Sequence, residues 1–200
     1  MKKNHFNTAT LLVVLSLVVA SCTHDKPVDT NSPAFHIAEA EKLTIPAAVD
    51  VPANLPNGNT RVATFYADGV QKYKAQVKAG SDPVAFEWVF VAPQADLYDA
   101  TNKKVGTHSA GPTWQLSAVD SIYGQAFNPA RTAPGNDATS VDWLLLMPKA
   151  GKIPTGIFTN VSYLQRIATK GGKAPTIPPV NATDVVDVKY TAIYRFTKQN

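Results

Sequence analysis

Apolar and polar residues alternate along much of this chain, and the pattern is clearest near the C-terminus. In the segment Val186–Phe196 every second residue is apolar, while charged residues such as Asp187 and Arg195 lie between them. Because successive side chains of a strand point to opposite faces, the pattern predicts an antiparallel strand with one buried face and one face in water. Ile193 is the one apolar residue on the polar face.

Other segments also carry strand patterns. Trp143–Met147 is a continuous apolar run that ends at Pro148, which predicts a central strand covered on both faces. Four apolar residues of Gly156–Thr169 are predicted to share one face of a strand: Ile157, Val161, Tyr163 and Ile167. Shorter strands are predicted at Arg61–Tyr66, Gln71–Val77, Phe86–Ala92, Val105–Ser109, Thr113–Ser117 and Ile122–Phe127.

Turn sequences separate these segments, among them Asp68-Gly69, Gly111-Pro112 and Gly171-Gly172. The chain has 15 prolines and 11 glycines, which suits many short strands joined by turns. Eight or nine strands at this spacing predict a single all-β domain, either an antiparallel β-sandwich or a β-barrel. One short helix is predicted over Pro33–Lys42, with Ser32 as its N-cap.

The N-terminus has the layout of a secretory signal. Lys2 and Lys3 precede a mainly apolar stretch, and small residues then lead to Cys22, the only cysteine in the chain. A transmembrane helix would need about twenty apolar residues, and this stretch is shorter. The ending resembles the lipobox of bacterial lipoproteins, which implies cleavage before Cys22, acylation of its thiol with fatty acids such as palmitate, and anchoring in the lipid bilayer.

This interpretation divides the chain into a signal peptide at 1–21, a lipidated tether with the short helix at 22–42, and an all-β domain at 43–200. Thr23–Pro33 is polar and contains prolines, so we expect a flexible tether. The residue after the cysteine is Thr23 and not aspartate. By resemblance to lipoprotein sorting, this favours the outer membrane of a bacterial cell envelope.

Charge and cysteine content exclude several functions. Removal of residues 1–21 takes away two lysines and lowers the formal charge from +4 to +2, so nucleic-acid binding is not predicted. Once Cys22 is acylated, no thiol remains for a disulfide, for thiolate catalysis or for a cysteine-ligated metal. One histidine and scattered aspartates lack the spacing of a metal site, so we predict no metal and no cofactor.

Several blocks of sequence, in this order, resemble the DUF3455 family, which has no established activity. The resemblance implies a domain from about Leu43 to Phe196. Family members commonly have a cysteine where this chain has Ala75, so a family disulfide would be dispensable for the fold. The blocks are Gly69–Tyr73, Trp88 with Ala92–Asp99, Gly106–Trp114, Trp143–Leu146, Gln165–Pro175 and Tyr190–Phe196.

Some members of that family carry a malate dehydrogenase label, which the residues here do not support. A nicotinamide-binding fold needs a strand, a Gly-x-Gly-x-x-Gly turn and a helix that begins at the pyrophosphate. Gly171-Gly172 is followed by Lys173-Ala174-Pro175 and a proline-rich loop, which cannot open a helix. We therefore predict no dinucleotide site.

Four residues are candidates for ligand binding: His108, Trp114, Tyr73 and Arg166. His108 precedes a Gly-Pro turn, and it is either a ligand contact or base, or a histidine bonded to backbone at a strand end. Arg166 could hold a carboxylate through two hydrogen bonds, or it could pair with Asp68 or Asp142 inside the fold. The aromatic residues could form a sugar-stacking platform or belong to the core.

No complete catalytic set is recognisable. A serine–histidine–aspartate set would need Ser109 or Ser121 with His108 and either Asp120 or Asp142, and no Gly-x-Ser-x-Gly elbow is present. We therefore expect a membrane-anchored extracytoplasmic lipoprotein whose β-domain binds a ligand or partner, such as a carbohydrate or an envelope protein, without catalysis. The alternative is a hydrolase of cell-envelope or extracellular polysaccharide that uses His108 as base. A purely structural envelope protein is the third interpretation.

Overall fold

The structure, a computed structural model, describes residues 27–200, so the predicted signal peptide and Cys22 lie outside the described residues. Within the described part, no helix is both long enough and apolar enough to cross a membrane. The elements are α1 (Pro33–Ala40), β1 (Asn59–Val77), β2 (Phe86–Tyr98), β3 (Lys104–Ser109), β4 (Thr113–Gln115), β5 (Ser121–Ala133), β6 (Trp143–Pro148), the 3-10 helix η1 (Gly156–Phe158), β7 (Val161–Gly171) and β8 (Val185–Gln199).

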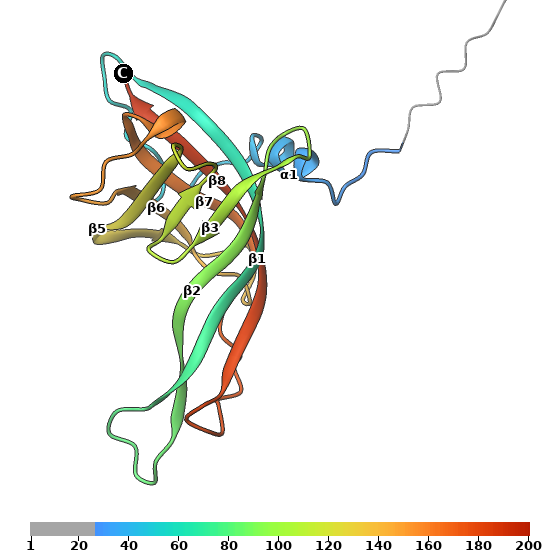
Figure 1. The fold of residues 1–200 in the computed structure, drawn as a ribbon, viewed down its shortest axis with the longest axis vertical. Helices are drawn as coiled ribbons and strands as arrows, with labels where there is room; N and C mark the ends of the chain where they lie inside the picture. Colours follow the sequence, from blue (N-terminus) through green and yellow to red (C-terminus); the bar gives the residue numbers. More distant parts are fainter. Residues whose placement is uncertain (1–26) are drawn as a thin grey trace, which may run out of the picture.

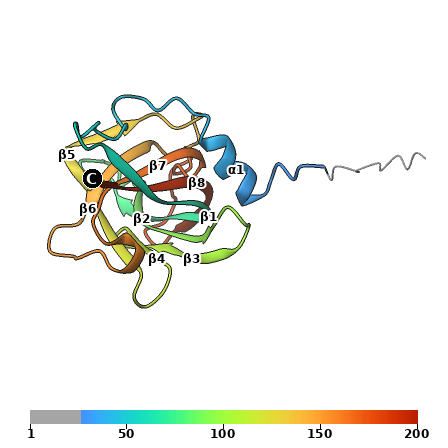
Figure 2. The same cartoon turned by 90° about the horizontal axis from the view of Figure 1, so that it is seen from above.

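The strands form one antiparallel sheet that closes on itself. Each strand pairs with the next along the chain, and β8 pairs with β1 over most of their length, which completes a ring (Figure 2). Closure leaves no free edge in the wall of the barrel. The all-β class is confirmed, and of the two predicted architectures the structure has the closed barrel.

Three strands, β1, β2 and β8, extend past the barrel as an arm (Figure 1). β3 pairs with β2 only from Ala95 onward, and β7 pairs with β8 only from Tyr190 onward. In the arm, β1 lies between β2 and β8, so that Lys74 is opposite Val89 of β2 on one side and Val185 of β8 on the other. The mouth of the barrel therefore lies where the arm begins.

The predicted turn at Asp68-Gly69 is wrong, because β1 runs through it without interruption. Both residues stay in the ladder with β2, where Gly69 lies opposite Ala95. A Cβ on Gly69 would overlap the backbone carbonyl oxygen of Gln94. Glycine is needed there because the two backbones approach closely, and two of the predicted strands are a single strand.

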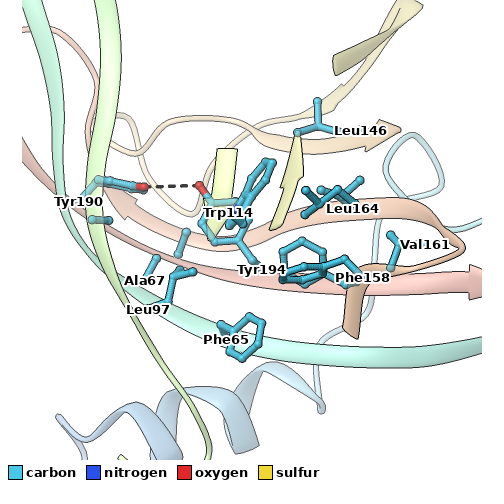
Figure 3. Packing of buried hydrophobic residues seen from close by; sticks show 14 residues of the cluster. Phe65, Ala67, Leu97, Trp114, Leu146, Phe158, Val161, Leu164, Tyr190 and Tyr194 are labelled. Atoms are coloured by element: carbon cyan, nitrogen blue, oxygen red, sulfur yellow. Dashed lines mark hydrogen bonds between the residues drawn. The ribbon is translucent and has the colours of Figure 1, made fainter. Parts of the chain in front are cut away.

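Large side chains fill the end of the barrel that lies away from the arm (Figure 3). The rings of Phe158 and Phe196 lie 4.8 Å apart, and Phe65 lies 5.8 Å from Phe196. Leu97 and Leu164 are fully buried in the same cluster. Trp114 contacts Phe196 edge-on at 5.8 Å, so its indole marks the inner limit of this packed region.

A second apolar cluster lies on the outer surface of the barrel. The short helix α1 begins at Pro33 as predicted, and the Ser32 hydroxyl accepts a hydrogen bond from the Phe35 amide. Ile37 of α1 and Val49 of the segment after it pack onto outward-facing side chains of β1, β6, β7 and β8. The packed unit therefore includes this helix, ahead of residue 43. The outward-facing residues are Tyr66, Trp143, Leu145, Ile167 and Ile193.

The outer cluster corrects the prediction of a wet face on β8. Ile193 is 2% exposed and Arg195 is 5% exposed, because α1 and the following segment cover them. The Arg195 guanidinium donates from Nη2 to the carbonyl oxygen of Ala40 at 2.8 Å and lies 3.1 Å from the Glu41 carboxylate. Trp143–Met147 is covered on both faces, as its continuous apolar run predicts.

The shared face predicted for Gly156–Thr169 is also wrong in part. A register shift between Val161 and Tyr163 places Val161 in the interior cluster and Tyr163 against the outer one. Ile157 belongs to η1 and is exposed. A bulge adds one residue to a strand and so changes which face the following side chains take.

Candidate functional site

A pocket of about 320 Å³ occupies the mouth of the barrel where the arm begins. Each of the eight strands contributes at least one residue to its lining. An eight-stranded barrel is just wide enough to be filled by side chains or to hold one small ligand. This barrel does both, since one end is packed and the other is hollow. The polar lining residues are Gln71, His108, Arg166 and Tyr194, together with the indole of Trp114.

Small residues keep the mouth open. Ala110, Gly111 and Ala126 line the pocket, where the opposite end of the barrel carries phenylalanines. The remaining wall is apolar, with Leu144 and Leu146 from β6 and with Phe90, Val91 and Pro93 from β2. Phe90 and Val91 are 50% and 52% exposed, so they form an apolar rim on the arm side.

His108 is buried in the wall and does not point freely into solvent. Its Nδ1 donates to the carbonyl oxygen of Thr113 at 2.9 Å, and its ring stacks on Trp114 at 4.4 Å with an interplanar angle of 11°. Because a carbonyl can only accept, the proton is on Nδ1 and the lone pair is on Nε2. Burial, together with the nearby charge of Arg166, lowers the pKa of His108 to about 3.

Two buried donors at the pocket have no hydrogen-bond partner among the described residues. They are Nε2 of Gln71, a residue 2% exposed, and Nε1 of Trp114, which is 0% exposed. Gly124 lies against the Trp114 ring, and a Cβ there would meet Cζ3 at 2.9 Å. The indole is therefore held in place by the close approach of β5. Buried donors without partners are uncommon, since each costs about 1–3 kcal/mol.

Arg166 carries the only charge among the lining residues. Its Nε and Nη2 donate to the backbone carbonyl oxygen of Asp142 at 3.1 and 2.8 Å, which fixes the guanidinium at the pocket. The Asp142 carboxylate instead lies 3.8 Å from Lys173. No acidic side chain of residues 27–200 forms an ion pair with Arg166. Tyr194 lies beside the site with a pKa raised by burial, so its phenol stays neutral.

The structure brings three of the four sequence candidates together, since His108, Trp114 and Arg166 all line the pocket. Tyr73 lies outside it. Its hydroxyl donates to the carbonyl oxygen of Gly172 at 2.7 Å, and its ring meets Phe90 edge-on at 5.8 Å. Sequence reasoning did not single out Gln71. This residue lies in the first family block and on β1, a strand with several buried side chains.

The other candidate arrangements do not assemble. The Asp120 carboxylate accepts hydrogen bonds from the Ser117 hydroxyl and the Ile157 amide, and it does not line the His108 pocket. Trp88 donates to the carbonyl oxygen of Ile177, and Trp143 is in the outer cluster, so the tryptophans form no common platform. In the part of the chain that the structure describes, no group of three or more His, Cys, Asp or Glu residues is placed to hold a metal.

Fold and pocket together define this molecule as a closed antiparallel barrel with a mainly apolar cavity at its mouth that contains a few polar groups. The family described as a protein of unknown function (DUF3455) matches residues 56–198, which cover the eight strands except the last residue of β8, and the chain belongs to this family. The resemblance stated from the sequence blocks is thereby confirmed. Comparisons with curated proteins and with solved structures found no match.

Proposed function

We propose that this protein is a lipid-anchored, extracytoplasmic binding module whose barrel-mouth pocket takes up a small ligand without chemical change. The anchor is supported by the sequence, in which a positive start and a short apolar stretch end in small residues before Cys22. Binding is supported by the pocket, which is concave, mostly apolar and furnished with a few convergent polar groups.

The unpartnered donors Gln71 Nε2 and Trp114 Nε1 carry the proposal. Both belong to residues that are almost fully buried, so an acceptor atom reaches these donors only when neighbouring side chains move aside. A ligand with acceptor atoms would satisfy these donors and remove their cost.

The hydrolase alternative finds little support in the pocket. A general base works best when its pKa lies near the operating pH, and that of His108 is about 3. No carboxylate orients the ring, because Nδ1 is bonded to a backbone carbonyl. The lining residues include no serine, threonine, cysteine or acid that could act as nucleophile or proton donor. We therefore assign His108 a structural role in the pocket wall, where its ring stacks on Trp114.

The anchor is tested by expression of the full chain in a lipoprotein-processing bacterial host with an alkyne-labelled palmitate analogue. We expect the label on the wild-type chain, loss of the first 21 residues by mass spectrometry, and recovery in the membrane fraction. The matched variant Cys22→Ser removes the only thiol and should abolish labelling. An uncut, unlabelled wild-type precursor would overturn the lipoprotein assignment.

Binding is tested with a variant that fills the pocket. Ala126 is an exposed residue of β5 that lines the mouth, so Ala126→Phe should occupy the cavity without disturbing the packed end. Ala130→Phe is the matched control, on the same strand and outside the pocket. Native mass spectrometry of protein isolated from its own membrane, with a thermal-shift screen of small metabolites, should show ligands that bind wild type and Ala130→Phe but not Ala126→Phe.

Two results would refute the binding function. If wild type, Ala126→Phe and Ala130→Phe retain the same ligands equally, binding occurs elsewhere. If the screen finds no ligand whose binding is lost in Ala126→Phe, the cavity has no binding role. Turnover of a compound by the wild-type protein, lost in His108→Asn, would instead establish the enzyme alternative.

A further inference from the structure

The charge pattern of the pocket narrows the ligand to one chemical class. Arg166 has no carboxylate partner among residues 27–200, and the lining contains no other charge. Two of its guanidinium nitrogens donate to one backbone carbonyl, and the guanidinium also interacts with the Tyr194 phenol. A single fixed cation therefore faces a mainly apolar space.

The field of Arg166 reaches the groups around it. Burial is the main reason that His108 resists protonation, and the Arg166 charge adds to it. The same charge acts on the Tyr194 phenol in the direction of ionisation, against the larger effect of burial. His108 stays neutral at physiological pH, so the pocket holds one positive charge and no more.

The neutral groups are arranged around this cation as donors and as an apolar wall. Gln71 Nε2 and Trp114 Nε1 each lack an acceptor. Apolar side chains of β2 and β6 line the same cavity, with Leu144 beside Arg166 in the β6–β7 ladder, and the exposed Phe90 and Val91 form the rim. A ligand that suits this lining carries its acceptor atoms at one end and carbon at the other.

On the basis of the proposed function, we propose that the pocket binds a small monocarboxylic acid with a compact apolar body. Its carboxylate is held by Arg166 with help from the Gln71 and Trp114 donors, and its body lies against the β2 and β6 side chains. A carboxylate fits a guanidinium through charge and hydrogen bonds together. A phosphate monoester, with up to two charges, would lack a second cation. The volume of about 320 Å³ lies at the small end of the range for ligand pockets, which favours a free acid over a peptide.

The test compares each acid with its uncharged amide on the purified full-length protein. The probes are phenylacetate with phenylacetamide, octanoate with octanamide, and inorganic phosphate, measured by isothermal titration calorimetry. We expect at least one acid to bind tenfold or more tightly than its amide, and phosphate not to bind. The indole N–H resonance of Trp114, assigned with Trp114→Phe, should shift with the acid because Trp114 is one of the lining residues.

Three variants locate the charge effect. Arg166→Gln removes the charge and should reduce the acid-to-amide preference to about one, whereas Arg166→Lys should keep a preference for the acid. Lys170→Gln, which removes an exposed charge from the same strand outside this pocket, should change nothing. Circular dichroism and the melting temperature establish that each variant is folded, and the Lys variant keeps the test valid if the Gln variant is not.

The outcomes separate this inference from the proposed function. Acid and amide that bind equally, and that Ala126→Phe excludes, would refute the carboxylate while the pocket remains a binding site. A carboxyl-terminated hexapeptide that binds when the free acids do not would refute the small-molecule class. If neither acids, amides nor the metabolite screen give binding that depends on the pocket, both proposals are wrong.

Discussion

Replacement of His108 should make the free energy of unfolding depend less steeply on pH at acid pH. The ring is 3% exposed, stacks on Trp114 and donates from Nδ1 to the Thr113 carbonyl. An added proton would place a buried charge near the Arg166 guanidinium, which is why the pKa falls from 6.5 to about 3. His108→Asn is a suitable perturbation, since the asparagine amide can still donate to the Thr113 carbonyl and cannot be protonated in this range.

The magnitude follows from linkage between protonation and folding. Because the pKa of His108 is lower in the folded state, the unfolded chain binds more protons between pH 6.5 and about 3. Its contribution to stability is complete above pH 6.5 and is lost as the pH falls, at about 1.4 kcal/mol per pH unit. The loss is about 3 kcal/mol by pH 4.5 and about 4 kcal/mol by pH 3, a large part of a typical stability of 5–15 kcal/mol.

Urea unfolding at pH 7.5, 6.5, 5.5 and 4.5 measures this slope. The exposed carboxyls of Asp99, Asp120, Asp137 and Asp184 have pKa values lowered by hydrogen bonds, so their contributions are lost only below pH 3.8 and stay outside the window. His108→Asn should be less stable at pH 7.5, because the stacking is lost, but its curve should fall less steeply. His36→Gln is the control for the other described histidine. Equal slopes for wild type and His108→Asn would refute a neutral, buried His108.

The strands could be predicted from the sequence because a period of two is a local property. The local sequence could not predict where a strand packs closely against a neighbouring strand or helix. Asp68-Gly69 has the composition of a turn, yet Gly69 is required by the closeness of β2 and not by a change of direction. The apolar Ile193 on a polar face was itself a signal of a second layer, and the helix over Ile37 supplies that layer.

The candidate site was predictable in part for a related reason. His108, Trp114 and Arg166 stood out as polar or aromatic residues in strands, and barrel closure brings strands β3, β4 and β7 to one mouth. Gln71 was missed because an amide in a strand is unremarkable until its surroundings are known to lack an acceptor. Tyr73 is an aromatic residue in a strand, like those of the pocket, but its hydroxyl donates to the backbone carbonyl of Gly172 instead of facing the pocket.

Three further changes test the packing around the barrel. Tyr73→Phe should lower the free energy of unfolding by about 1–2 kcal/mol, because the carbonyl of Gly172 loses a buried donor; an unchanged urea midpoint would show that water replaces it. Gly69→Ala should cost about 2 kcal/mol or more through overlap with the Gln94 carbonyl, and a melting temperature equal to wild type would contradict the close approach. Arg131→Ala removes three hydrogen bonds to carbonyls of the segment before β1, so hydrogen exchange there should accelerate at least tenfold while the barrel strands stay protected; uniform protection would refute this anchoring role.

The two ends of the barrel contribute to stability in different ways, and this difference connects the fold to the proposed binding function. At the filled end, Phe158 and Phe196 close the interior with carbon-to-carbon contacts. At the mouth, Gln71 and Trp114 keep donors without acceptors beside a cation without a carboxylate. Under the proposed function, a ligand that binds at this mouth stabilises the folded state by RT ln(1 + [L]/Kd), which is about 2.7 kcal/mol at a hundredfold excess over Kd. A rise in melting temperature with ligand concentration is therefore the expected mark of the correct ligand, and it should vanish when Ala126→Phe fills the mouth.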